Sequence, residues 1–352
     1  MSEKIRVGII GVGSISEAHL LGYQNLPDVE IYAFCDINEK RLREMGKKYG
    51  VTRLFTDKDE MLALPEIDAV SVCTWNSQHA PCSIAALKAG KHVMCEKPMA
   101  MNTEEAEEMK KAAEESGKLL MVGFVRRYKE STNVLKEFSE NGTLGDIYYT
   151  KATYLRRHGN PGGWFGDKSR SGGGPLIDLG VHVIDMARFV MGNPKPVSAY
   201  GITFNKLGNR KNLVDQPPYV SIGSTSDDIC DVEDFASAVI RFENGGVVSV
   251  ETSFDLNLKE DIGTFEVFGT KGGGKLSPDL EIYTDVNGYM ADVQIKKKLD
   301  TENAFISEFR HFIDCVKGDA ECVSPAEDGV IMMKILDAIY ESAKKGEAVK
   351  IK

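Results

Sequence analysis

The sequence lacks the features that mark membrane and secreted proteins. No apolar run in its 352 residues approaches the length of a membrane-spanning helix. The opening residues, MSEKIRVGII, contain no apolar signal segment followed by a small-residue cleavage site. We therefore expect a cytoplasmic protein without a membrane partner.

Cysteine pairs and an excess of basic residues are also missing. The seven cysteines are odd in number and scattered, and none has C-x-x-C spacing, which predicts reduced thiols rather than a disulfide framework or a zinc knuckle. The net charge is −10. Because a nucleic-acid surface needs a basic footprint, we expect no nucleic-acid partner. A phosphate-bearing cofactor is still compatible, since backbone N–H groups bind phosphates locally.

Strands and helices are predicted to alternate along the first third of the chain. Apolar runs predict strands at residues 4–10, 29–36, 68–74, 91–96 and 118–123, with helical segments between them. This order is typical of a doubly wound parallel α/β sheet. We predict an N-terminal Rossmann domain over residues 1–123.

The pattern changes after Gly123. Strands are predicted at 145–157, 196–205, 233–242, 247–256 and 262–268, with helices near 130–140, 302–317 and 325–344. The ENGG sequence at 243–246 favours a hairpin turn. We predict a second domain, residues 124–352, of α+β type with a large, mostly antiparallel sheet. The cleft between two domains is the expected ligand site.

The turn after the first strand carries a dinucleotide signal, GVGSIS at residues 11–16. Gly11 permits a tight turn, and Gly13 allows the backbone to approach a pyrophosphate at the helix start. We expect Ser14 and Ile15 to complete this phosphate-binding turn. Asp36, at the end of the second strand, is placed to bind the adenosine ribose hydroxyls. Its carboxylate repels a 2′-phosphate, so NAD is favoured over NADP.

The segment GGGPLIDLGVHVIDMAR, residues 172–188, is the most unusual in the chain. Its glycines are expected to let the backbone approach a ligand, and Pro175 suits the first helical position. Asp178, His182 and Asp185 follow at offsets of four and three, which predicts one helix face. Three ionisable groups in an apolar helix need a chemical task or partners. A metal site, an acid–base site and a buried polar cluster all remain open on this pattern.

Six motifs in fixed order give the chain a family resemblance. They are GVGSIS, the aspartate after the second strand, NSQH (76–79), EKP (96–98), GF-x-RRY (123–128) and GGGPLIDLGVHVID (172–185). Together they resemble the Gfo/Idh/MocA family, named for glucose–fructose oxidoreductase, inositol dehydrogenase and rhizopine-catabolism proteins, over essentially the whole chain. One position departs from the family: Trp75 follows Thr74 where proline is common.

The resemblance implies a catalytic group made of Lys97, Asp178 and His182. It also implies a Lys–Pro bond that is often cis, and homodimers or homotetramers built through the C-terminal sheet. A metal needs three or more converging ligands, and the positive charge of Lys97 would repel a metal ion nearby. We therefore expect no metal. Asp185 is then left as a buried structural carboxylate whose partner the sequence does not name.

Further residues are expected around the cofactor and the substrate. Besides the glycine turn and Asp36, the expected cofactor-binding residues are Thr74, Asn76, His79, Glu96 and Lys97. The expected substrate contacts are Arg127, Trp164 and His158, in a pocket for a polyhydroxylated small molecule. The basic residues near 156–170 suggest an anionic substrate, but arginines paired with surface carboxylates explain them better.

The function expected from these observations is an NAD-dependent dehydrogenase acting on a ring carbinol or ketone of a sugar, cyclitol or sugar derivative. A redox-cycling enzyme that cleaves or epimerises glycosides is one alternative. A dinucleotide-binding sensor without chemistry is another, although it would not need Lys97 and His182. A metalloenzyme using Asp178, His182 and Asp185 is the third.

Overall fold

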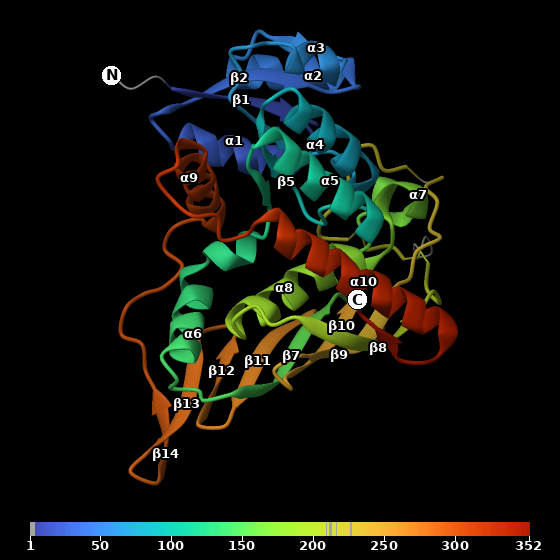
Figure 1. Ribbon diagram of the computed structural model, residues 1–352. Helices are drawn as coiled ribbons and strands as arrows, with labels where there is room; N and C mark the ends of the chain where they lie inside the picture. The colour runs from blue at the N-terminus through green and yellow to red at the C-terminus, as the bar shows by residue number, and fades with distance from the viewer. Residues whose placement is uncertain (1–3, 209, 211–212, 216, 226) are drawn as a thin grey trace. The chain divides into compact units, whose positions relative to one another are not determined.

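The computed structural model describes residues 4–208, 210, 213–215, 217–225 and 227–352. The chain divides into two compact units (Figure 1). The first unit contains residues 1–125 and 302–333, and the second contains residues 126–301 and 334–352. We predicted a single boundary after residue 123. The contacts instead assign the C-terminal segment 302–333 to the first unit. Among the described residues, no helix is both long and apolar enough to cross a membrane.

The first unit is built on a six-stranded sheet with all strands parallel, ordered β3-β2-β1-β4-β5-β6. Its strands are β1 (Ile5–Ile10), β2 (Val29–Cys35), β3 (Leu54–Phe55), β4 (Ala69–Val72), β5 (His92–Cys95) and β6 (Leu120–Val122). Its helices are α1 (Ser16–Gln24), α2 (Glu39–Tyr49), α3 (Lys58–Leu62), α4 (His79–Lys88), α5 (Thr103–Ser116) and α9 (Ala304–Lys317). The central strands are buried on both faces, which explains their continuous apolar sequences. The predicted Rossmann arrangement is confirmed.

Two capping groups fix where the helices of this unit begin. Asn38 accepts a hydrogen bond from the Arg41 N–H, and Asn102 accepts one from the Glu105 N–H. Short β3 and α3 were not predicted, because two and five residues are too few for a periodic pattern.

The second unit is built on a nine-stranded sheet ordered β14-β13-β12-β11-β7-β10-β9-β8-β15. Its strands are β7 (Ile147–Leu155), β8 (Pro196–Phe204), β9 (Phe235–Phe242), β10 (Val247–Ser253), β11 (Ile262–Gly269), β12 (Gly272–Leu276), β13 (Glu281–Val286), β14 (Tyr289–Val293) and β15 (Val349–Lys350). Its helices are α6 (Glu130–Glu140), α7 (Lys168–Ser171), a π-helical turn η4 (Leu176–Gly180) and α8 (Val181–Val190). Helix α10 (Ala326–Lys345) spans the division between the units.

The sheet of the second unit is mostly antiparallel, as predicted. The exception is the central pair β7 and β10, which run parallel. β12 to β14 were not predicted. Residues 272–276, GGGKL, have low strand propensity, and the glycines serve close packing instead. A Cβ on Gly274 would lie 2.5 Å from the Leu135 side chain on α6.

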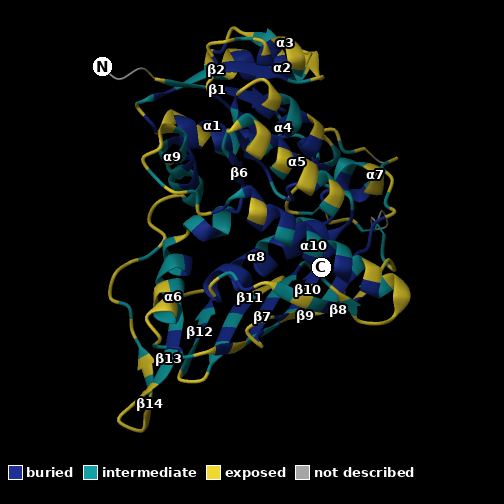
Figure 2. Ribbon diagram, in the orientation of Figure 1, coloured by how far each residue is buried: buried dark blue, intermediate teal, exposed yellow. Residues whose placement is uncertain are grey.

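Helix α8 forms the core of the second unit. Figure 2 shows it in the colour of buried residues along nearly its whole length, and it packs on β7, β10 and β11. Strands such as β9 alternate buried and exposed residues, so one face of the sheet is covered and the other is left uncovered by the described residues. The uncovered face carries apolar side chains that include Tyr200, Ile202 and Phe204.

Candidate active site

The glycine turn of the first unit has two glycines with different physical roles. Gly11 has a φ of +88°, and a Cβ there would lie 2.7 Å from the carbonyl oxygen of Cys73. Only glycine fits that position. A Cβ on Gly13, in contrast, meets no described atom within 4 Å. The fold therefore does not explain glycine at 13, whereas the close approach of a pyrophosphate does.

The start of helix α1 suits an anion. Ile15 precedes its first residue, and no described side chain caps the helix. Ser16 is fully buried, and its hydroxyl donates to the Gly13 carbonyl at 2.7 Å. A small residue therefore occupies the third glycine position of the motif and its hydrogen bond holds the turn together. Helix N-termini without a side-chain cap are ready-made phosphate sites. Gly11, Gly13, Ser14 and Ile15 thus form a turn that fits the pyrophosphate of a dinucleotide.

Asp36 is held beside this turn. Its Oδ2 accepts the Val12 N–H and its Oδ1 accepts the Asn38 N–H, both at 2.8 Å. Each oxygen keeps a second lone pair for a ribose hydroxyl. Arg41, the nearest candidate for a 2′-phosphate, donates instead to the Val12 carbonyl at 2.9 Å and to Glu17 at 2.9 Å. The arrangement therefore favours NAD, as the sequence did.

His79 contacts both of the loops that follow β4 and β5. Its Nδ1 lies 2.7 Å from the Pro98 carbonyl and its Nε2 lies 3.1 Å from the Thr74 carbonyl. The ring is fully buried, and burial lowers its pKa, although both carbonyls oppose that shift. His79 therefore positions Thr74 and the Lys97–Pro98 segment. Asn76, on the same loop, is buried.

Glu96 occupies the position before Lys97 and is itself held by a buried histidine. Its Oε1 lies 2.8 Å from His19 Nε2, and its Oε2 accepts the Lys97 N–H at 3.2 Å. His19, together with Lys97 and His79, lowers the pKa of Glu96 against the opposing effect of burial. The carboxylate therefore stays ionised and fixes the backbone of Lys97. The Lys97–Pro98 peptide bond is cis, and Lys97 is half-buried.

In the second unit, Asp178 and His182 stand out by their exposure. Every residue from 176 to 190 is buried except these two, which are half-buried. Asp178 belongs to the π-helical turn and His182 to the first turn of α8. π-Turns are frequent at functional sites. Two polar groups therefore reach the surface from an otherwise buried helix.

Asp185 differs from Asp178 and His182 because it is buried, as expected for a structural carboxylate. Its side chain is 2% exposed and pairs with the Arg127 guanidinium, whose side chain is 0% exposed. Arg127 Nε lies 3.0 Å and 3.1 Å from the two carboxylate oxygens, and Nη2 lies 2.5 Å from Oδ1. The predicted substrate contact by Arg127 is therefore wrong, because the guanidinium is buried against Asp185. Arg127 is therefore the partner of Asp185 that the sequence did not name.

The glycines before η4 were expected to approach a ligand, but the protein itself occupies that space. A Cβ on Gly173 would lie 2.0 Å from the Tyr340 hydroxyl, and one on Gly174 would lie 2.1 Å from the Glu233 carbonyl. The Glu233 carboxylate accepts the N–H groups of Gly174 at 3.0 Å and Leu176 at 3.2 Å, and the Tyr340 hydroxyl at 2.9 Å. Glu233 and Tyr340 thus hold the start of the turn that carries Asp178. Nothing in the sequence near DVEDF signals this role.

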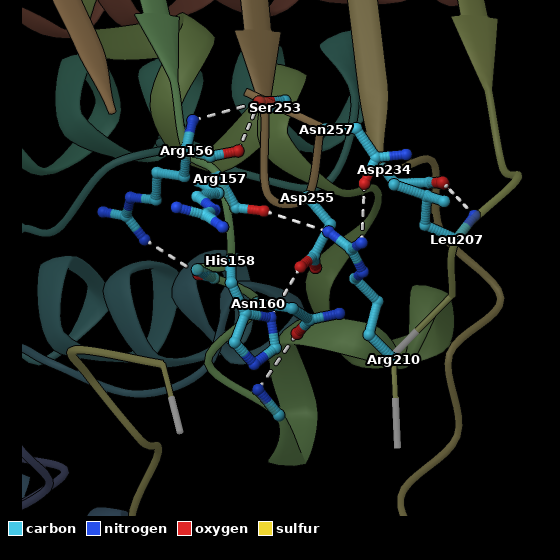
Figure 3. A network of polar contacts seen from close by, with 12 residues as sticks. Arg156, Arg157, His158, Asn160, Leu207, Arg210, Asp234, Ser253, Asp255 and Asn257 are labelled. Carbon is cyan, nitrogen blue, oxygen red and sulfur yellow. Dashed lines mark hydrogen bonds and ion pairs between the residues drawn. The ribbon is translucent and has the colours of Figure 1, made fainter. Parts of the chain in front are cut away.

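The remaining substrate candidates lie in one loop region of the second unit. His158 Nδ1 lies 2.7 Å from Oδ1 of the fully buried Asp255, which fixes the ring (Figure 3). Trp164 is half-buried and stacks on Phe165, with ring centroids 3.9 Å apart. Asp228 holds this loop by accepting the N–H of Gly163. The geometry leaves His158 and Trp164 available for a substrate.

Three arginines of this region bind the protein itself. Arg156 donates to the Gly159 carbonyl at 3.1 Å, and Arg157 donates to the Lys259 carbonyl at 2.9 Å. Arg170 pairs with Asp167 at 2.7 Å. Arg170 thus pairs with a carboxylate as expected, whereas Arg156 and Arg157 are held by main-chain carbonyls, so all three arginines have partners within the protein.

A cavity of about 630 Å³ opens elsewhere in the second unit. Arg126, Tyr154 and Asp300 are among its lining residues, and α8 contributes Val183 and Met186. Its volume is within the range of small-molecule sites. None of the predicted substrate residues lines it, so we do not assign the substrate to it on volume alone.

Comparisons with known proteins establish the class. A family model described as an oxidoreductase family with an NAD-binding Rossmann fold matches residues 5–124. A second model, the GFO/IDH/MocA C-terminal domain, matches residues 132–274. The chain belongs to the GFO/IDH/MocA family of NAD-binding oxidoreductases, which confirms the family resemblance, the enzyme class and the cofactor.

Individual relatives cover the whole chain. It is 37% identical over 353 residues to D-glucoside 3-dehydrogenase of Escherichia coli, covering 99% of this chain and 98% of the relative. It is 31% identical over 352 residues to myo-inositol 2-dehydrogenase of Thermotoga maritima, with coverage of 99% and 98%. Among solved structures, levoglucosan dehydrogenase in complex with NADH superimposes with a TM-score of 0.86 at 27% identity, covering 99% of this chain and 100% of that chain.

Proposed function

We propose that this oxidoreductase transfers hydride between NAD and a ring carbinol of a neutral sugar, glycoside or cyclitol. The observation that carries the chemistry is the pair Asp178 and His182, the only two residues of 176–190 that are not buried. The substrate class is supported by relatives named for a glucoside, an inositol and levoglucosan. The arginines that would have favoured an anionic substrate are bound to main-chain carbonyls.

In this proposal the three catalytic residues have different tasks. His182 accepts the hydroxyl proton, since imidazole titrates near neutrality. Asp178 orients the imidazole or binds a substrate hydroxyl. Lys97 donates a hydrogen bond to the reacting oxygen and stabilises its developing negative charge. When bound, NAD supplies the hydride acceptor.

Further residues are proposed to bind rather than react. Gly11, Gly13, Ser14, Ile15 and Asp36 hold the dinucleotide. Thr74, Asn76, His79 and Glu96 shape the loops at the ends of β4 and β5. Trp164 offers an aromatic face for a sugar ring, and His158 offers Nε2, because Asp255 holds Nδ1. Gly11 and His79 act mainly through the backbone that they position.

The decisive experiment measures NADH formation on a panel that begins with glucosides and includes inositols, aldoses and uronates, with NADP in parallel. We expect NADH from neutral ring alcohols. Lys97→Ala and His182→Ala should each lower kcat by about 10²–10⁴-fold and leave the Kd for NAD nearly unchanged. Lys88→Ala, an exposed lysine of the same unit, is the matched control.

Two results would contradict the proposal. Normal turnover in either variant would remove that residue from the catalytic group. Tight NAD binding without NADH from any carbohydrate would contradict a dehydrogenase. Product formation from a glycoside without net NADH would instead indicate a cofactor that is reduced and reoxidised within one cycle.

We also propose that the uncovered sheet face of the second unit pairs two copies of the chain. Tyr200, Ile202 and Phe204 alternate along β8 and are 45%, 38% and 44% exposed, and Val239 lies opposite Tyr200 on β9. An apolar strip of this kind marks an interaction surface, and most soluble oligomers are symmetric copies. Light scattering should find a dimer or tetramer, and Ile202→Lys should dissociate it. A monomeric wild type would refute the pairing.

The seven thiols support a cytoplasmic location.

A further inference from the structure

A cluster of sulfur and nitrogen ligands lies outside the residues considered so far. His311 and Cys315 are one turn apart on α9, so they share one helix face. Gly318, with a φ of +81°, ends the helix, and its N–H bonds to the Cys315 carbonyl at 3.1 Å. The chain then reverses and brings Cys322 back to the same face.

The returning segment is anchored to the sheet of the first unit. The Ser324 carbonyl accepts the Val122 N–H at 3.0 Å, and Pro325 forms a β-bridge with Met121 in β6. Cys322 is therefore held by a fixed loop rather than by a free one. All three side chains are half-buried, so an ion has access from solvent while two sulfurs and a nitrogen converge on it.

We propose that His311, Cys315 and Cys322 form a binding site for a thiophilic divalent metal ion of the zinc class. Their ligand atoms all lie within 4.8 Å of one another, and His311 Nε2 is 3.3 Å from Cys315 Sγ. Tetrahedral zinc with bonds of about 2.0–2.3 Å keeps its ligand atoms roughly 3.5–3.8 Å apart. Side-chain rotations that move the ligand atoms by about 1 Å would therefore bring them to the separations that zinc requires. A water molecule would take the fourth position.

Hydrogen bonding identifies Nε2 as the His311 nitrogen that carries the lone pair, and a metal ion would replace the Val323 N–H on it. The Val323 N–H donates to His311 Nε2 at 3.2 Å, so this nitrogen acts as the acceptor and the ring proton sits on Nδ1. The acceptor nitrogen is the one next to the sulfurs. Among the described residues, this is the one group of three histidine, cysteine or carboxylate ligands close enough to hold an ion.

A metal ion displaces the proton of a coordinating thiol outright, so Cys315 and Cys322 would bind as thiolates. The site departs from our expectation of no metal, because ligands spaced H-x₃-C-x₆-C match no common zinc motif.

The bound ion would stabilise the packing of α9 on α1. Phe309, on α9, packs against the rings of His19 and Tyr23 with centroid distances of 4.4 and 4.8 Å. A Cβ on Gly22 would lie 2.2 Å from the Phe309 ring, so the two helices are in close contact. An ion that ties α9 to the loop after it would hold this contact in place, and α1 begins at the dinucleotide turn.

The test uses the full-length enzyme, reduced, stripped with a chelator, reloaded with zinc and desalted. Elemental analysis should find close to one zinc ion per chain in the wild type. The Cys315→Ser/Cys322→Ser variant and His311→Ala should lose the ion, whereas Cys230→Ser, a half-buried cysteine of the second unit, should keep it. Cobalt(II) should give thiolate charge-transfer absorption in the wild type and not in the double variant. Unchanged NAD affinity shows that each variant is folded, and Cys322→Ser alone serves if another variant fails to fold.

Three results would overturn the proposal. One is zinc content that does not differ between the wild type and the Cys315→Ser/Cys322→Ser variant. Another is a wild type that retains no zinc after desalting. The third is a Cys315–Cys322 disulfide in enzyme prepared without air, found by mass spectrometry, because those sulfurs would then not be available as ligands. Removal of zinc should also lower the melting temperature of the wild type and leave that of the double variant unchanged.

Discussion

The buried pair of Arg127 and Asp185 gives the most quantitative prediction. The two side chains are 0% and 2% exposed, and the guanidinium also lies 5.0 Å from the Phe189 ring centroid. Removing one member takes away the opposite charge that the other buried group faces. Such a loss costs about 3–5 kcal/mol, whereas replacing both members by apolar groups of similar volume is often neutral. We therefore expect Asp185→Leu and Arg127→Met to lower the free energy of unfolding strongly as single substitutions and only slightly when combined.

The expected melting shift follows from the size of the second unit. One kcal/mol moves the melting temperature of a unit with 150–250 residues by about 2–4 °C. Each single variant should therefore melt roughly 6–20 °C below the wild type. The double variant should recover most of that loss, so the two effects are strongly non-additive.

The two tryptophans of the chain allow each unit to be followed separately. Trp75 lies in the first unit and Trp164 in the second, so a Trp75→Phe background leaves Trp164 fluorescence as a reporter of the second unit. Urea unfolding in this background gives the free energy of unfolding of all four chains in the cycle. Single-variant losses below about 1 kcal/mol, typical of exposed ion pairs, would refute the buried-pair argument. Losses that simply add in the double variant would refute the coupling.

The same cycle separates a structural role from substrate binding. If Arg127 only neutralises Asp185, a stable double variant should keep most of the wild-type kcat/KM. A double variant that unfolds normally but has a greatly raised KM would return Arg127 to the substrate site.

Two further predictions concern the cofactor turn and the support of η4. Gly13→Ala should weaken NAD binding and leave the melting temperature unchanged, because its Cβ meets no described atom. Gly11→Ala should lower both the affinity for NAD and the melting temperature, because its Cβ would meet the Cys73 carbonyl. Equal destabilisation by the two substitutions would contradict this distinction. Burial raises the pKa of Glu233 in the folded state. Between the pKa of the unfolded chain and that of the folded chain, the folded chain therefore keeps a proton that the unfolded chain has lost. The contribution of Glu233 to stability falls as the pH rises through this interval. Glu233→Gln should flatten the dependence of the unfolding free energy on pH over this interval, and an unchanged slope relative to the wild type would argue against it; the exposed Glu251→Gln should keep the wild-type slope.

Local patterns were enough to predict much of the fold and of the cofactor site. The strands and helices of the first unit follow from apolar runs and capping residues, which act over a few positions. The same is true of the glycine turn and Asp36, whose spacing has a direct mechanical reason. Short elements such as β3 and Gly-rich β12 were missed, because pairing with neighbours and not propensity places them there.

Partners that are distant in the sequence were beyond prediction. Arg127 is separated from Asp185 by 58 positions, and Gly174 from Glu233 by 59. Glu233 is separated from Tyr340 by 107. No periodicity connects such positions, and the glycines at 173 and 174 looked like ligand contacts because a glycine does not show what approaches it.

The sequence by itself determined the dinucleotide turn, since its motif spacing acts locally. The family resemblance that the motifs carry indicated the class of protein and implied Lys97, Asp178 and His182 as catalytic candidates. Only the tertiary structure decided which charged groups reach the surface. It left Asp178 and His182 half-buried, neutralised Asp185 with Arg127, and gathered His311, Cys315 and Cys322 at one end of α9. The physical reason is that burial and pairing depend on which distant elements pack together, and a buried charge persists only where packing supplies its partner.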